Sequence, residues 1–255
     1  MEFFAGLVPQ ALDPAAALVL VAASFFTSAL TAAFGVGGGV AMLALLGVFL
    51  PVAALIPVHG AVQLGSNTGR AWHQRANIRR DIALPFIAGS LVGAVAGAFL
   101  VIQIPDAILK LALGCFIIAV TWTKLPGAAR IGAAGLAAGS AVLALLTMFV
   151  GATGPLLATF FAKVLPNDRK QLVATHAAGM TIQHALKVVV FGFAGFAFAQ
   201  WLPLIAAMVV SGYLGTVYGT RLLDRIPEES FRFWFRIAIT LLALDLVRRG
   251  LAGLF

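Results

Sequence analysis

The sequence predicts an all-α, polytopic membrane protein built from two inverted repeats of five segments, with short glycine-broken helices near the midplane. Three observations predict this fold: the composition, the number of apolar segments, and short segments at matching places in the two halves. Of the 255 residues, 62% are hydrophobic and 10% are charged, whereas soluble domains carry about 25% charged residues. Lipid is the solvent that suits such a chain.

Ten apolar segments follow one another along the chain. Eight are long enough, or nearly so, for the roughly 20 residues that a straight crossing needs. The second and seventh are short, and glycine-rich breaks at 35–39 and 151–155 precede them, which leaves open whether they span the membrane or re-enter it. Paired breaks of this kind mark the binding site in many transporters. The segments are about 15–34, 38–50, 53–72, 82–102, 106–123, 131–150, 153–165, 171–197, 199–222 and 231–253.

An internal duplication relates the halves, and we expect repeats over residues 1–125 and 126–255. Because each repeat has an odd number of segments, the second repeat should enter the membrane from the opposite face. The corresponding sites are Leu50-Pro51 and Leu165-Pro166, His59 and His176, Asn67 and His184, Arg70 and Lys187, and the stretches 93–97 and 215–219.

Basic residues follow the odd-numbered segments, as the positive-inside rule requires of one membrane face. We expect a multi-pass protein of the bacterial inner (plasma) membrane. If every segment crosses, both of its termini lie outside the cytoplasm. Arg248 and Arg249 break the rule, and nearby Asp245 is their expected partner. The residues that obey it are Arg75, Arg79, Arg80, Lys124, Arg130, Lys163, Arg169, Lys170, Arg221 and Arg225.

Polar residues form a stripe on the third and on the eighth segment. In the third segment their spacing keeps them within about 80° of one helical face. Polar groups inside a membrane are costly, so they normally face a bundle interior or a wet cavity. Arg70 could instead extend to the interface, and the histidines could serve helix packing as well as substrate contact. The stripes are His59, Gln63, Asn67 and Arg70, and His176, Gln183, His184 and Lys187.

The glycine-rich breaks supply a second set of candidate binding groups. A helix that restarts inside the membrane points unpaired N–H groups and a positive dipole end outward, which suits an anion. Helix packing through small residues is the alternative function of these glycines. The lysine spacing of a phosphate-binding P-loop is missing. The candidate residues are Gly37, Gly38, Gly39, Thr153 and Gly154.

The charge pattern favours an anion as cargo. Arg70 and Lys187 lie where a cation carrier would place acids, and Asp245 is the one acid well inside an apolar segment. We see no nucleophile and base pair of an enzyme, no metal ligand set and no cofactor motif. The basic residues lack the aromatic interleaving of a nucleic-acid surface. Cys115 lies in an apolar run, where we expect a buried small hydrophobe.

The glycine motifs at 34–39 and 151–155, with His59 and His176, resemble the sulfite exporter TauE/SafE family of membrane transporters over nearly the whole chain. The resemblance implies two repeated halves and a secondary carrier that moves sulfite, sulfoacetate or other small organosulfonates. An anion channel, a permease for a non-sulfur anion and a structural assembly factor are the alternatives. The expected partners are the small anion, membrane lipid and a coupling proton or sodium ion, with a homodimer left open.

Overall fold

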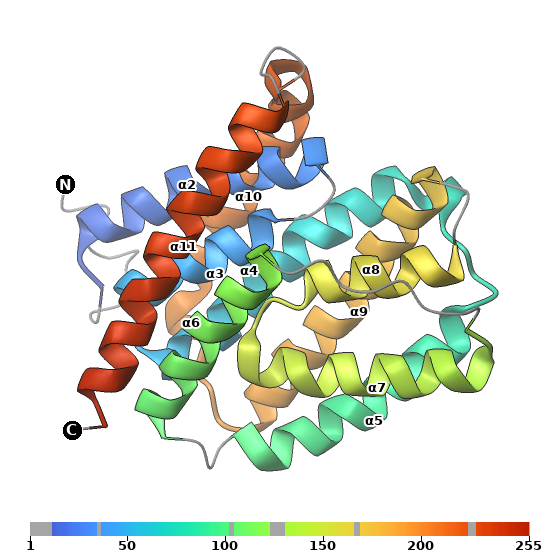
Figure 1. Ribbon diagram of the computed structural model, residues 1–255, viewed down its shortest axis with the longest axis horizontal. Helices are drawn as coiled ribbons and strands as arrows, with labels where there is room; N and C mark the ends of the chain where they lie inside the picture. The colour runs from blue at the N-terminus through green and yellow to red at the C-terminus, as the bar shows by residue number, and fades with distance from the viewer. Residues whose placement is uncertain are drawn as a thin grey trace.

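The computed structural model describes residues 12–34, 37–101, 105–122, 131–165, 169–223 and 228–254 as a bundle of α-helices (Figure 1). Two short 3₁₀ helices, Arg75–Asn77 and Phe198–Trp201, precede α5 and α10. The α-helices are α2 (Pro14–Phe34), α3 (Gly38–Phe49), α4 (Val52–His73), α5 (Ala83–Val101), α6 (Asp106–Trp122), α7 (Ala133–Val150), α8 (Gly154–Val164), α9 (Arg169–Phe193), α10 (Leu202–Leu223) and α11 (Glu228–Ala252).

The prediction of ten helical segments is confirmed for this part of the chain, to within a few residues at most ends. Both predicted breaks are present. Gly37 caps α3 with φ of 108°, and Gly151 ends α7 with φ of 76°. Positive φ values of this kind suit glycine, which has no Cβ to clash with its own backbone. Gly35 and Val36 lie outside the described residues.

By length and composition, three helical stretches among the described residues could cross a membrane: Pro14–Ala32, Ala133–Val150 and Phe198–Tyr218. This is fewer than the eight expected. The helices α4 and α9 have 22 and 25 residues and are long enough, but their polar stripes lower their mean hydropathy. Gly38–Phe49, Ala83–Phe99 and Ala107–Ala119 are apolar but shorter.

The short helices do not span a bilayer by themselves. With 12 residues in α3 and 11 in α8, a rise of about 1.5 Å per residue makes each less than about 20 Å long. The hydrocarbon core is about 30 Å thick. The expected placement of both termini outside the cytoplasm required these segments to cross, so it has lost its support.

Helices pair across the two halves of the chain. The fourth helix of each half packs along the first helix of the other half, α5 on α7 and α10 on α2, while α4 packs on α9 and α6 on α11. Figure 1 shows α5 and α7 side by side along one edge of the molecule. The boundary expected at 125–126 lies outside the described residues.

Individual contacts show the directions of these paired helices. Near the start of α4, Gly60 lies against the side chain of Lys187, whereas the loop after α4 reaches the start of α9, where the Arg79 N–H donates to Thr175 Oγ1 at 3.1 Å. The two helices therefore run antiparallel. The helices α6 and α11 do the same, because Gly114 lies against Val247 and the Trp122 indole N–H donates to Thr240 Oγ1 at 2.8 Å.

One close helix contact occurs in both halves. Gly93 of α5 lies against the backbone carbonyl of Ala141 in α7, and Gly215 of α10 lies against that of Phe25 in α2. A Cβ at either glycine would overlap the carbonyl oxygen, so only glycine lets these backbones approach. The two glycines correspond in the sequence duplication, and Phe25 and Ala141 each stand ten residues before the glycine that opens a break.

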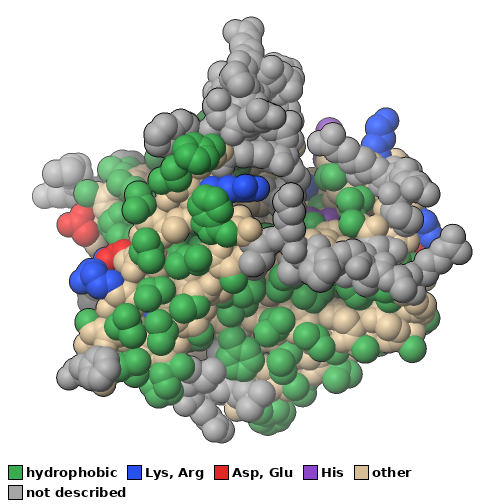
Figure 2. Space-filling view, viewed as in Figure 1, with side chains coloured by type: hydrophobic (Ala, Val, Ile, Leu, Met, Phe, Trp, Pro, Cys, Tyr) green, Lys and Arg blue, Asp and Glu red, His purple; other side chains and the backbone are tan. Residues whose placement is uncertain are grey.

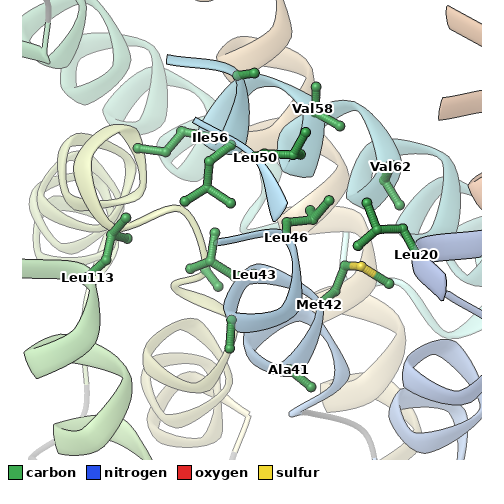
Figure 3. Packing of buried hydrophobic residues seen from close by; sticks show 14 of the residues in the cluster. Leu20, Ala41, Met42, Leu43, Leu46, Leu50, Ile56, Val58, Val62 and Leu113 are labelled. Carbon is green, nitrogen blue, oxygen red and sulfur yellow. The ribbon is translucent and has the colours of Figure 1, made fainter. Parts of the chain in front are cut away.

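The larger apolar core surrounds α3. Met42, Leu43 and Leu46 are fully buried there among residues of α2, α4 and α6 (Figure 3). The outside of the molecule is also largely apolar, with few charged side chains on the face in Figure 2. Large hydrophobic side chains such as Leu84 and Phe99 are mostly exposed. Cys115 is exposed as well, so the prediction that it is buried was wrong: it lies on the outward face of α6.

Charged residues pair at the ends of the bundle. The Asp245 carboxylate accepts from Arg248 and Arg249 at 2.7 Å, as expected. Arg79 binds Asp81 in the loop after α4, and these hydrogen bonds lower the pKa of Asp81. Among the predicted interfacial residues, the side chains of Lys163, Arg169 and Arg221 are not described, and Lys124, Arg130 and Arg225 lie outside the described residues.

Candidate functional site

A small cavity of about 30 Å³ lies where the two breaks meet α4 and α9. It brings together predicted residues from both halves of the chain. They are Gly37, Gly39, His59, Gln63, Asn67, Arg70, Gly154, His176 and His184. The remaining lining residues are Thr31, Val40, Ala152, Pro155 and Met180, of which Ala152 and Pro155 belong to the predicted break at 151–155.

The first turns of both short helices contribute to this cavity. Gly37 and Gly39 reach it from the start of α3, and Gly154 and Pro155 from the start of α8. Neither helix has a side-chain cap on its N-terminus. The first N–H groups of a helix have no partner within it, so two positive helix ends meet at the same small space.

Two histidines hold these helix starts in the same way. His59 Nε2 donates to the Gly39 carbonyl at 2.9 Å, and His176 Nε2 donates to the Gly154 carbonyl at 3.0 Å. Each ring therefore joins a polar stripe to a short helix and also lines the cavity. Of the two functions that the sequence left open for these histidines, helix-helix hydrogen bonding is present, and substrate contact stays a prediction.

Arg70 is the cation that faces the cavity. Arg70 is 8% exposed, so its side chain points into the protein and does not extend from its surface. One guanidinium nitrogen donates to Asn67 Oδ1, and Asn67 Nδ2 donates to the Gln63 carbonyl at 2.7 Å. The Nε of Arg70 is buried and has no hydrogen-bond partner. The guanidinium thus keeps donor capacity for a ligand.

Carboxylates are missing from the interior of the described part of the chain. Its buried polar residues include Arg70 and Lys187 but no aspartate or glutamate, and its ion pairs lie at exposed or partly exposed positions. Burying a charge without a counterion is costly. The site therefore has an excess of buried positive charge.

Lys187 is fully buried but does not line the cavity. Its ammonium donates to the Gly151 carbonyl at 2.6 Å and to Thr147 Oγ1 at 3.1 Å. Thr147 lies in the last turn of α7, and Gly151 opens the break that follows it. The equivalent positions Arg70 and Lys187 thus face different surroundings, which the sequence pattern did not separate.

Three further predicted residues lie outside the lining. Gly38 packs directly against the Thr27 carbonyl of α2. The Thr153 hydroxyl and both amide atoms of Gln183 are buried without a partner. His184 lines the cavity, and its ring lies 5.8 Å from that of His59, edge to face.

Thr31 was missed, although a signal for it exists. It stands four residues before Gly35, and Thr147 stands four residues before Gly151. In the structure Thr31 lines the cavity and Thr147 binds Lys187. A search for polar residues at fixed distances before both breaks would have found the pair.

Apolar helices that are interrupted around a basic cavity, with no acid among its described lining residues, are typical of polytopic membrane transporters. A family model described as sulfite exporter TauE/SafE matches residues 20–246 of this chain. The chain belongs to that family, which confirms the resemblance seen in the sequence, and it is a multi-pass membrane protein. No curated protein and no solved structure matches the chain.

Proposed function

We propose that the protein is a secondary transporter that moves small sulfur-containing anions, such as sulfite, sulfoacetate or another small organosulfonate, across the bacterial inner membrane by alternating access. The observation that carries this proposal is Arg70: a buried guanidinium at a cavity wall, with an unpartnered Nε and no buried acid among the described residues.

The lining favours an anion over a cation or a neutral solute. An uncompensated buried charge costs several kcal/mol, and an anion in the cavity would offset that cost. Arg70 supplies the positive charge, and the uncapped starts of α3 and α8 add N–H donors and two positive dipole ends. Lys187, outside the lining, adds to the positive potential.

The dimensions and donors favour a compact oxyanion. A cavity of about 30 Å³ has room for only a few water molecules, since one water needs roughly 10–15 Å³. Sulfite and the sulfonate group present several acceptor oxygens close together. Charge-assisted hydrogen bonds to such oxygens are the strong ones. Gln63 and Asn67 would select among oxyanions from one wall, and His184 from the other.

The helix pairing supports two repeats of opposite orientation. A two-fold axis in the membrane plane makes equivalent helices antiparallel, as α4 and α9 are, and also α6 and α11. The equivalent contacts Gly93 to Ala141 and Gly215 to Phe25 support the same relation. Transporters with this symmetry alternate access by moving one group of helices against another around a fixed midplane site.

Two measurements test the proposal on the purified protein. A thermal-shift panel of sulfite, thiosulfate, sulfoacetate, taurine, nitrate and acetate should show the largest rise in unfolding temperature with a sulfur oxyanion, because a bound ligand stabilises the folded state. Equal rises with nitrate or acetate would indicate a permease for other anions, and no rise with any anion would refute an anion site.

Transport in proteoliposomes separates a carrier from a channel. Radiolabelled substrate should exchange faster when unlabelled substrate is present on the opposite side, because a carrier then changes its orientation with substrate bound in both directions. Flux that is insensitive to substrate on the far side would refute alternating access and indicate an anion channel.

A further inference from the structure

The break between α7 and α8 holds a cation that belongs to the protein itself. Lys187 donates to the Gly151 carbonyl at 2.6 Å and to Thr147 Oγ1 at 3.1 Å. The Thr147 hydroxyl also donates to the Gly151 carbonyl at 3.2 Å. These groups lie at the C-terminal, negative end of α7, where a positive charge is stabilised by the helix dipole.

This arrangement has the chemistry of a small-cation site. Carbonyls of interrupted helices and half-helix C-terminal ends hold the coupling sodium ion in many secondary transporters. A backbone carbonyl and a threonine hydroxyl are hard oxygen ligands of that type. In this protein the Lys187 ammonium occupies the position that a sodium ion would take, and the aliphatic part of its side chain packs against Gly60 of α4.

We infer that Lys187 is a tethered substitute for a coupling cation, so that the protein binds and carries its anion without sodium. This inference rests on the proposed function. It assigns different functions to the two equivalent cations. Arg70 faces the cavity and binds the anion, while Lys187 is a positioning residue that holds the α7–α8 break and, through it, the start of α8.

The burial of Lys187 supports this assignment. Its side chain is fully buried and lies outside the cavity lining, and the hydrogen bonds described for its ammonium go to two groups at the C-terminal end of α7. A substrate-binding lysine would direct its ammonium into the cavity. A packing residue without a cation function would not need a charge, since an apolar chain could fill the space beside Gly60 at lower cost.

The test replaces the tethered cation by a free one. Lys187→Ala removes ammonium and stem together and leaves space next to Gly151 and Thr147. Its unfolding temperature should fall below that of the wild type and rise again with sodium or methylammonium chloride, but not with choline chloride at the same ionic strength. No selective rise with either small cation would overturn the inference.

Two control variants separate a cation site from general salt effects. Lys187→Met fills the space without a charge and should gain nothing from small cations. Lys170→Ala removes an exposed lysine from the same helix and should behave like the wild type. A selective gain in either control would overturn the assignment of the site.

A second arm uses the wild-type protein and does not depend on any variant. The thermal shift produced by the best anion of the panel should be the same in sodium and in choline buffers. An anion shift that requires sodium would overturn the inference and leave the anion site intact. If no anion shifts the wild type, the proposed function fails, while the cation rescue of Lys187→Ala can still succeed.

Discussion

Replacing Arg70 by methionine should weaken anion binding without destabilising the empty protein. Methionine keeps most of the unbranched stem and removes the charge. A hydrogen bond to a charged group contributes about 1.5–3 kcal/mol, and each 1.4 kcal/mol is tenfold in affinity. Loss of one such bond therefore predicts roughly 10- to 150-fold weaker binding of the anion.

The stability of the anion-free protein should change little or rise in this variant. Arg70 is 8% exposed and has no acid partner among the described residues, so its removal relieves a desolvation cost. The Asn67 oxygen that loses its donor lines the cavity, where water can replace it.

A titration of the unfolding temperature against anion concentration measures both the anion affinity and the stability of the anion-free protein. Arg75→Met is the matched control, because Arg75 is exposed, donates to the Trp72 carbonyl and lies over its ring. It should keep wild-type anion affinity. An unchanged anion titration in Arg70→Met would refute the assignment of Arg70, and with it the main support for the proposed function.

Two further substitutions test how the short helices are positioned. Gly38→Ala should destabilise the protein by about 1–3 kcal/mol through overpacking, because its Cβ would overlap the Thr27 carbonyl. The control is Gly192→Ala inside α9, where a Cβ would make only an ordinary contact with Phe198 and alanine suits a helix at least as well as glycine. Equal unfolding temperatures of the two variants would contradict this packing. His176→Phe keeps a ring but removes the hydrogen bond to the Gly154 carbonyl, so a loss of about 0.5–1.5 kcal/mol with weaker anion binding is expected. A wild-type anion titration would show that this bond does not position α8.

The helices and breaks followed from the sequence because lipid imposes strong constraints on it. Segment lengths reflect membrane thickness, and glycines mark both interruptions. The stripe on α4 was placed correctly at the cavity, since helical spacing fixes which residues share a face. His59 and His176 illustrate the value of the duplication, because the same sequence position has the same carbonyl partner in each half.

The distinct surroundings of Arg70 and Lys187 could not be predicted in this way. Periodicity states which face of α9 carries Lys187, but its partners Thr147 and Gly151 lie 40 and 36 residues away. Their position depends on how α7 ends. Gly38 shows the same limit: the sequence treats it like its neighbours, and only its contact with Thr27 assigns it to packing.

The pairing of α2 with α10 and of α5 with α7 has a consequence for how the protein matures. Because Phe25 meets Gly215, α2 lacks its neighbour α10 until nearly two hundred further residues have been synthesised. Until then lipid or an insertase must cover its small-residue face. Expressed alone, either half would leave four helices without their partners from the other half, so we expect co-expressed halves to assemble and single halves to be degraded.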